Sequence, residues 1–315
     1  MNLKKVSLIM DEIIKLREVT KVYNRNEVVS NVSMDIKRGQ IYGFLGPNGA
    51  GKTTIMKMLL NLVKPTSGVI EVFGETLNLS SCSYLKRIGN IIEYPIFYDK
   101  FSVMENLRLH CEYMGFYDYN EINEVLKLVH LDKIGSKPVA EFSLGMKQRL
   151  GIARALITKP ELLILDEPIN GLDPMGIKEM RELFLKIKKQ YNTTILISSH
   201  IITEIEQIAD EIGIINNGKI IKEVTMKDVR KENLQYIEIQ VDDLKKAVTI
   251  LDSHFRTNNF KVISDNGIRI YDENISQKNL CRELVLSGVN VYGVTSKSDN
   301  LEDYFMNLIN GGIQQ

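Results

Sequence analysis

The sequence lacks tryptophan, long apolar runs and any excess of charge of one sign. Among its 315 residues, 40 are lysine or arginine and 40 are aspartate or glutamate, so the formal net charge is zero. A uniformly basic surface is therefore excluded, and we expect no nucleic-acid partner. No uninterrupted apolar stretch reaches the roughly 18 residues that a bilayer-spanning helix needs. Any membrane role must therefore be exercised through another polypeptide.

Cysteine is also scarce. Cys82, Cys111 and Cys281 are far apart, odd in number and without metal-ligand spacing. This usage favours a reducing, cytoplasmic setting in which each cysteine is a small buried residue. Residues 1–10 are too short for a secretory signal and have no A-x-A-like cleavage site. They are expected to be an N-terminal extension.

Length and apolar periodicity predict two domains. Half-buried strands are expected at 14–23 and 32–36, followed up to about residue 225 by alternating strand and helix patterns. This alternation predicts an α/β domain at residues 11–225 with a mostly parallel sheet, interrupted by a mainly helical segment at about 81–150. After about Met226 the pattern restarts as strand, helix, hairpin, helix and strand. That order predicts a small α+β ferredoxin-like accessory domain at residues 226–315.

A glycine-rich loop follows a short buried strand at 41–45 and precedes a helical pattern at 53–62. It fits the phosphate-binding pattern G-x-x-x-x-G-K-[ST] in the required strand–loop–helix context. Its glycines allow backbone N–H groups to converge on phosphate oxygens, and the N-terminus of the following helix favours the same anion. Lys52 is expected to bridge the β- and γ-phosphates, and the Thr53 hydroxyl to bind Mg²⁺. The candidate ATP-binding residues here are Gly46, Pro47, Asn48, Gly49, Ala50, Gly51, Lys52, Thr53 and Thr54.

A second candidate site comes at the end of the apolar run at 162–165. Asp166 and Glu167 follow this run directly. We expect Asp166 to hold magnesium and Glu167 to act as the base that polarises the attacking water. A carboxylate pair at the end of a strand is common by itself, but it becomes specific when it follows a phosphate-binding loop.

Four further segments carry a family resemblance. Phe142-Ser143-Leu144-Gly145-Met146-Lys147-Gln148-Arg149 is similar to the signature of ABC transporter ATPases, usually L-S-G-G-Q. Asn170-Gly171-Leu172-Asp173-Pro174 resembles the D-loop of that family, and Ser198-Ser199-His200 resembles its switch histidine. Lys21-Val22-Tyr23 matches the aromatic position that stacks on adenine. The chain is identified by these motifs, in the family's order, as an ABC transporter ATPase with the P-loop ATPase fold: a mixed sheet core, an antiparallel β subdomain and a helical subdomain.

The resemblance implies roles that spacing alone does not supply. It implies that the signature residues Ser143, Leu144, Gly145 and Met146 contact the nucleotide held by a second ATPase subunit, with a homodimer expected. His200 is expected to contact the γ-phosphate of its own chain, and Asp173 to lie in the D-loop. Two alternatives to these roles remain: His200 would cap the following helix instead of contacting phosphate, and Tyr23 would be an ordinary aromatic residue of a strand instead of stacking on adenine.

Three positions depart from the family pattern. The signature has Leu144 in place of glycine and Met146 in place of glutamine, so the contact with the partner is altered. Glu93 occupies a position where most members have a glutamine that binds magnesium and senses the permease. Glu93 is therefore a third expected magnesium ligand, since hard cations prefer oxygen. Together with the segment S-L-G-M-K-Q-R-L at 143–150 and the accessory domain, the Glu93 substitution resembles the bacitracin-resistance and lantibiotic-immunity branch.

The function expected from this resemblance is ATP hydrolysis, with ATP and Mg²⁺, that drives export of a peptide antibiotic or related drug. A separate integral-membrane permease would hold the chain on the inner face of the plasma membrane. The alternatives are a non-transport ABC ATPase that acts as a cofactor-assembly or regulatory scaffold, and an accessory domain that serves only dimerisation or ligand binding.

Overall fold

The computed structural model describes residues 12–78, 82–116, 118–232, 235–272 and 274–298. The chain divides into one compact unit up to Met226 and a second from Lys227 onward. The expected extension at 1–10 lies outside the described residues. Among those that are described, no helix is both long and apolar enough to cross a membrane.

The first unit contains an antiparallel sheet of four strands. Their order is β2 (Asn26–Lys37), β1 (Glu12–Tyr23), β4 (Ser67–Val72) and β5 (Glu75–Thr76). The turn between β1 and β2 is Asn24-Arg25, both with positive φ. Alternate apolar side chains such as Ile14, Leu16 and Val32 are buried, as half-buried strands require. This sheet is the antiparallel β subdomain of the expected fold.

The central sheet has six strands and is parallel except at one edge. Its order is β10 (Lys219–Thr225), β9 (Glu211–Asn216), β3 (Ile41–Leu45), β8 (Thr194–Ser199), β7 (Leu162–Leu165) and β6 (Ile88–Ile91). Among the strands that the structure describes in this sheet, only β9 and β10 pair antiparallel, through the turn at Asn217-Gly218. Strands β3, β7 and β8 are buried along their whole length, which is why they appear in the sequence as continuous apolar runs.

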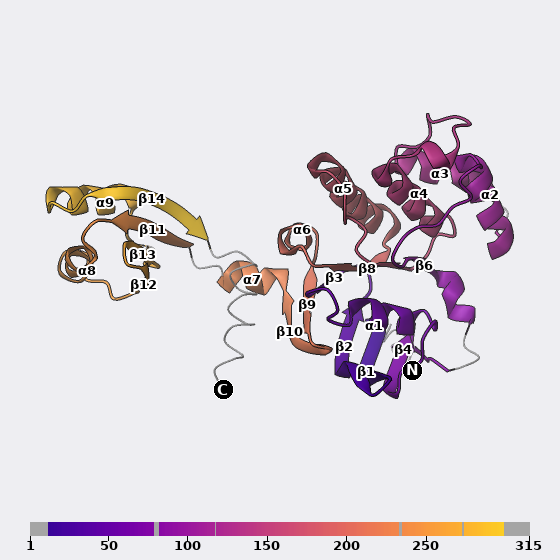
Figure 1. The fold of residues 1–315 in the computed structure, drawn as a ribbon, viewed down its shortest axis with the longest axis horizontal. Helices are drawn as coiled ribbons and strands as arrows, with labels where there is room; N and C mark the ends of the chain where they lie inside the picture. The colour runs from indigo at the N-terminus through magenta and orange to yellow at the C-terminus, as the bar shows by residue number, and fades with distance from the viewer. Residues whose placement is uncertain (1–11, 79–81, 117, 233–234, 273, 299–315) are drawn as a thin grey trace, which may run out of the picture. The chain divides into compact units, whose positions relative to one another are not determined.

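Helices cover both faces of the central sheet. Helix α1 (Lys52–Leu59) lies between the two sheets, and α5 (Pro174–Tyr191) and α6 (Ile202–Glu206) lie on the opposite face (Figure 1). The main hydrophobic core joins the inner face of the antiparallel sheet to α1 and to the central strands. The glycine-rich loop is therefore held between two packed layers.

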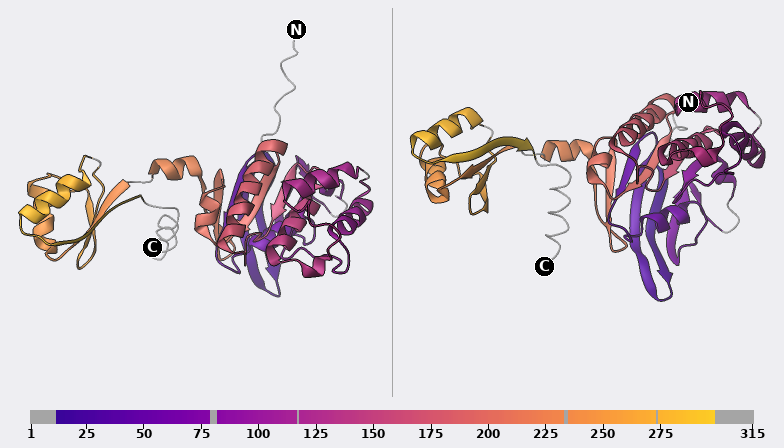
Figure 2. Two further views of the ribbon diagram at one scale, coloured as in Figure 1. Left: turned by 90° about the horizontal axis from the view of Figure 1, so that it is seen from above. Right: turned by 45° about the horizontal axis from the view of Figure 1, so that its top comes forward.

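The helical segment differs from the sequence prediction at its start. The segment from 81 was expected to be mainly helical, but a short 3₁₀ turn, Ser83–Arg87, leads into strand β6, the edge strand of the central sheet. Four residues paired to β7 are too short a run to show strand periodicity. Three helices follow: α2 (Val103–Met114), α3 (Asn120–Leu128) and α4 (Leu144–Leu156). They lie together beside strand β6 at the edge of the sheet, and both views of Figure 2 show this group. A second 3₁₀ turn, Val139–Glu141, precedes α4.

The second unit has a four-stranded antiparallel sheet. After α7 (Met226–Glu232) the chain forms β11 (Gln235–Val241), α8 (Leu244–Ser253), β12 (Phe260–Ser264), β13 (Gly267–Ile270), α9 (Gln277–Leu286) and β14 (Val291–Ser298). The strand order is β12-β13-β11-β14. Ile239, Leu251 and Leu280 belong to a core of this unit's own, so the sheet and its two helices bury one apolar face together.

The cysteines differ from one another more than the sequence suggested. Cys111 is buried, but Cys281 is half-buried and Cys82 is exposed, and all three are free thiols. The expectation that each is a small buried residue is therefore wrong for two of them. Cys82 directly precedes the 3₁₀ turn at the surface, a context that composition does not reveal.

Candidate functional site

The glycine-rich loop joins the carboxyl end of β3 to the start of α1. Gly46 has no room for a side chain, because a Cβ there would lie 2.2 Å from the carbonyl oxygen of Ile215. Gly49 and Gly51 have φ values of +80° and +108°, which other residues rarely adopt. Both features curl the backbone tightly before the helix begins. The loop is therefore shaped by its glycines into a concave turn of backbone N–H groups.

Helix α1 begins with its N–H groups available to an anion. Its N-cap residue is Gly51, no side chain caps it, and its first turn contains no acidic residue. The first N–H groups of a helix have no partner within the helix, and the helix dipole adds partial positive charge there. This end of α1 therefore fits a phosphate group.

The Lys52 side chain is buried and lies along the loop. It is only 5% exposed, and its Nζ donates hydrogen bonds to the carbonyl oxygens of Gly46 (2.6 Å) and Pro47 (3.2 Å). Nζ also lies 3.2 Å from Oε1 of Glu167. The ammonium group is thus fixed between the glycine-rich loop and the acidic strand end.

Asp166 follows β7 and is held by two hydroxyl groups. The Thr53 hydroxyl donates to its Oδ2 at 2.7 Å, and the Ser198 hydroxyl donates to its Oδ1 at 2.6 Å. Asp166 is only 2% exposed, so both interactions are shielded from water. The structure thus brings together two of the three residues that the sequence assigned to magnesium, Thr53 on α1 and Asp166 after β7.

Glu167 is the next residue and adopts a left-handed backbone conformation, with φ of 48°. Its N–H donates to the Ser198 hydroxyl at 2.9 Å, and its Oε2 lies 2.8 Å from Nδ1 of His200. Its Oε1 is paired with Lys52. Glu167, His200 and Lys52, the three expected catalytic residues, therefore form one connected group.

Strand pairing explains why residues distant in sequence meet. Strand β8 lies between β3 and β7, and all three run parallel, so their carboxyl ends share one edge of the sheet. Leu165 is paired with Ile197, which brings the following residues, Asp166 and Ser198, opposite each other. A parallel sheet collects its functional groups at this edge.

The signature residues lie at a separate place, at the start of α4. Ser143 is the N-cap of this helix, and its hydroxyl accepts a hydrogen bond from the N–H of Met146 at 3.3 Å. Asp173 is likewise the N-cap of α5 and accepts from the N–H of Gly176 at 2.7 Å. A cavity of ≈ 430 Å³ contains Ser143, Leu144, Gly145 and Asp173 in its lining. The exposed Leu144 approaches the Gly171 backbone there.

Two predicted residues are not in contact with this group. Tyr23, at the end of β1, is 42% exposed, and its ring centroid lies 4.7 Å from Nζ of Lys21. Glu93 forms an ion pair with Lys57 at 2.6 Å. Among the described residues, the structure does not bring the Glu93 carboxylate into contact with Thr53 or Asp166.

Ser198 and Lys57 had no individual role predicted from the sequence. Ser198 was part of the segment ending in His200, and its position two residues before that histidine on β8 was the available signal. Lys57 follows Thr53 by four residues, so its position on α1 was predictable, but its pairing with Glu93 depends on the loop conformation.

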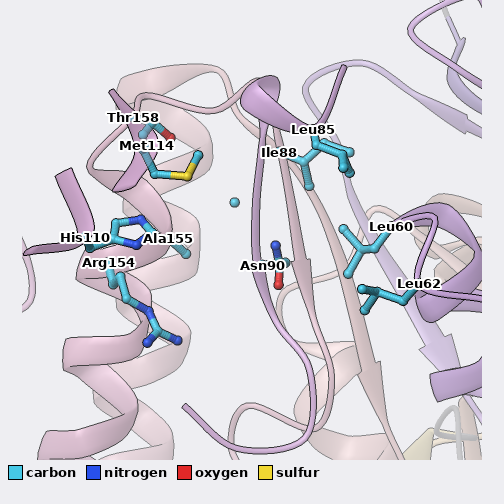
Figure 3. Close-up of a pocket in the computed structure, with 11 residues that line it drawn as sticks. Leu60, Leu62, Leu85, Ile88, Asn90, His110, Met114, Arg154, Ala155 and Thr158 are labelled. Atoms are coloured by element: carbon cyan, nitrogen blue, oxygen red, sulfur yellow. The ribbon is translucent and has the colours of Figure 1, made fainter. Parts of the chain in front are cut away.

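A different cavity, of ≈ 320 Å³, lies between the sheet edge and the helical segment. In Figure 3 Leu60, Leu62 and Asn90 lie on one side, and His110, Met114 and Arg154 lie on the other. Burial lowers the pKa of His110 to about 4, with a smaller contribution from Arg154. This largely apolar lining has no glycine cradle and does not fit a phosphate group.

The fold and the first site define a P-loop ATPase. Residues 29–170 match the family described as ABC transporter. The chain is 54% identical over 96% of its length to an uncharacterized ABC transporter ATP-binding protein, YcbN, of Bacillus subtilis, covering 98% of that protein. It is 48% identical over 96% of its length to the bacitracin transport ATP-binding protein BcrA of Bacillus licheniformis, covering 99% of it. The structure of an ATP-binding subunit of an ABC transporter matches with a TM-score of 0.62 and 30% identity, over 70% of this chain and 92% of the other.

The chain therefore belongs to the ABC transporter ATP-binding proteins. This membership confirms the family resemblance and the P-loop ATPase fold that the sequence predicted. The similarity to a bacitracin transport protein also agrees with the branch that the sequence suggested.

Proposed function

We propose that the chain binds ATP at Gly46 to Thr54 and hydrolyses it with Glu167 as the general base. The observation that carries this proposal is the single group formed by Lys52, Glu167 and His200. Glu167 accepts a proton from the attacking water, and Lys52 offsets the charge that develops on the γ-phosphate. His200 holds the Glu167 carboxylate in place and senses the same phosphate.

The residues at this edge also fit a magnesium ion. Mg²⁺ prefers oxygen ligands and is usually held by one or two protein side chains together with substrate phosphates and water. Thr53 and Asp166 present such oxygens side by side. When bound, the ion neutralises phosphate charge during transfer. The hydroxyl of Ser198 keeps Asp166 oriented toward Thr53.

A second copy of the chain completes each nucleotide site. The first turn of α4 contains no acidic side chain, so Ser143 and the N–H groups at this helix start suit an anion presented from outside. The triphosphate held by one protomer is therefore expected to bind between its own glycine loop and the signature residues of the partner. The exposed Tyr23 ring is available to stack on adenine.

The cargo is proposed from similarity. The match to the bacitracin transport protein includes the second unit, because it extends over 96% of this chain, whereas the family match ends at residue 170. We infer that the chain energises export of a peptide antibiotic of the bacitracin or lantibiotic type through a separate permease. It would then act in the cytoplasm, on the inner face of the plasma membrane.

Susceptibility tests can examine this proposal. The chain is expressed together with a candidate permease from the same genome in a bacitracin-sensitive bacterial host, and inhibitory concentrations of bacitracin and a lantibiotic are measured. We expect resistance to one peptide class, and its loss on Glu167→Gln substitution. Unchanged susceptibility to both classes, with hydrolysis intact, would reject the cargo and leave the ATPase assignment standing.

A further inference from the structure

The loop between strand β6 and the helical segment is attached at both ends. We call residues 92–98 the connecting loop. Glu93 is paired with Lys57 on α1, the helix that follows the glycine loop. Arg154 on α4, the signature helix, donates from Nη1 to the carbonyl oxygen of Ile96 at 2.6 Å. The connecting loop is thus bonded to both helices that serve nucleotide.

Further contacts fix the end of the connecting loop near α4. The Arg154 guanidinium lies 4.9 Å from the ring centroid of Phe97, a cation–π distance. Gly151 faces Pro95, and a Cβ at that glycine would lie 2.8 Å from the Pro95 Cβ. The signature helix therefore approaches the loop as closely as a glycine permits, so displacement of α4 must displace residues 95–97.

Direct packing between α1 and the helical segment is interrupted nearby. The ≈ 320 Å³ cavity of Figure 3 separates Leu60 and Leu62, just past α1, from His110 and Met114 of α2 and from Arg154. At this cavity α4 packs against β6, since a Cβ at Gly89 would lie 2.1 Å from the carbonyl oxygen of Ala155. The Glu93–Lys57 ion pair attaches the loop that follows β6 to α1.

The Glu93 carboxylate is engaged by Lys57 and is not bonded to the Thr53–Asp166 pair. Its carboxylate Oε1 accepts a hydrogen bond from Lys57 Nζ at 2.6 Å, while the Thr53 hydroxyl is bonded to Asp166 instead. The backbone of Glu93 is left-handed, with φ of 62°. This conformation is costly for glutamate, and it sets the direction in which the side chain leaves the loop. A glutamine at this position would form no ion pair with Lys57.

We propose that Glu93 acts by pairing with Lys57 and does not ligate magnesium. Lys57 is a positioning residue: it holds the connecting loop on α1, so that the phosphate-binding helix and the signature helix move together. This inference rests on the proposed ATP hydrolysis in a dimer, because the signature of one protomer serves the nucleotide of the other.

The expected effect is modest, because the pair is partly open to water. The Lys57 and Glu93 side chains are 33% and 58% exposed, and such pairs contribute up to about 1 kcal/mol. Loss of the pair is therefore expected to lower steady-state ATP turnover by about five-fold, since about 1.4 kcal/mol corresponds to ten-fold. Salt screens exposed pairs, so the difference should shrink in 1 M salt.

Charge reversal distinguishes the two roles of Glu93. The purified full-length chain is compared with Glu93→Lys, Lys57→Glu and the double variant, with Glu124→Lys as a matched control that breaks the exposed Glu124–Lys127 pair on α3. ATP turnover is measured as a function of Mg²⁺. Binding of trinitrophenyl-ATP with and without Mg²⁺ gives a second reading that does not require hydrolysis.

If the ion pair matters, each single reversal lowers turnover about five-fold, and the double variant returns to within about two-fold of the parent. The Mg²⁺-dependent gain in nucleotide affinity then stays the same in all variants.

A lysine at position 93 cannot bind the cation. A double variant that is as impaired as Glu93→Lys and has lost the Mg²⁺-dependent gain in affinity would therefore overturn the proposal. Normal turnover in both single variants would overturn it too. A parent chain that hydrolyses no ATP would instead reject the proposed function.

Discussion

The substitution Glu167→Gln separates chemistry from binding at the proposed active site. Glutamine has nearly the same shape, and its carbonyl oxygen can still accept a hydrogen bond from Nδ1 of His200, which lies 2.8 Å from the carboxylate. Lys52 keeps its hydrogen bonds to the Gly46 and Pro47 carbonyl oxygens. The variant therefore loses the basic group and its charge while the surrounding geometry is retained.

The expected loss of hydrolysis is large. General-base catalysis typically contributes 10²–10⁴-fold, so the single-turnover rate should fall by about that factor. This corresponds to a barrier increase of about 3–5 kcal/mol. Nucleotide affinity should change by less than about three-fold, because the glycine loop, Lys52 and the start of α1 are unaltered. The left-handed backbone of residue 167 costs glutamine about as much as glutamate.

Phosphate release in a single turnover and fluorescent nucleotide binding measure the two quantities separately. Glu124→Gln is the matched control, since it makes the same chemical change at an exposed position of α3 and should hydrolyse normally. Size-exclusion chromatography with light scattering should also detect an ATP-dependent dimer of the Glu167→Gln variant. A hydrolysis rate within about three-fold of the parent would remove Glu167 from the role of base and refute this assignment.

Three further outcomes follow from other parts of the structure. Tyr23→Ala should weaken ATP binding by about 1–3 kcal/mol while Tyr23→Phe binds normally; equal titration curves for both would exclude stacking. Ser143→Ala in the Glu167→Gln background should reduce ATP-dependent dimerisation by at least about ten-fold and lower the unfolding free energy by about 1 kcal/mol, because a helix cap is lost; an unchanged dimer constant would exclude a role across the interface. His110→Gln should make the unfolding free energy less sensitive to acid. The folded pKa of His110 is lowered to about 4 from 6.5, so the stability that neutral His110 provides is present above pH 6.5 and is lost as pH falls toward 4. At pH 5 the loss is about 2 kcal/mol, or about 1 kcal/mol after allowance for solvent screening; parallel denaturation midpoints for parent and variant between pH 7 and 5 would contradict it.

Much of the fold was predictable because its signals are local. The glycine-rich loop, the apolar runs of β3 and β7 and the Asn217-Gly218 turn each follow from residues adjacent in sequence. The short strand β6 was not predictable, because four residues have no periodicity of their own. Its conformation depends on hydrogen bonding to β7, which lies about seventy residues further along the chain.

The sequence predicted which residues make up the candidate site, but it predicted fewer of the contacts between them. Thr53, Asp166 and Glu167 were assigned from motifs, and the parallel order of β3, β8 and β7 brings them to one edge. The role of Ser198 could not be assigned, because its position two residues before His200 does not show which groups its hydroxyl contacts. Only strand register shows that its hydroxyl serves both acidic residues.

Glu93 illustrates why a motif position does not determine what its side chain does. Glu93 was expected to bind magnesium because the family motif has a glutamine at this position, and the glutamine amide is neutral. A carboxylate at the same position carries a charge that any nearby cation can neutralise, and Lys57 lies one helical turn beyond Thr53. The charged residue is therefore drawn toward α1 by an attraction that glutamine lacks. Replacement of glutamine by glutamate thus keeps an oxygen ligand but adds an ion pair with Lys57, and this ion pair links the connecting loop to the phosphate-binding helix.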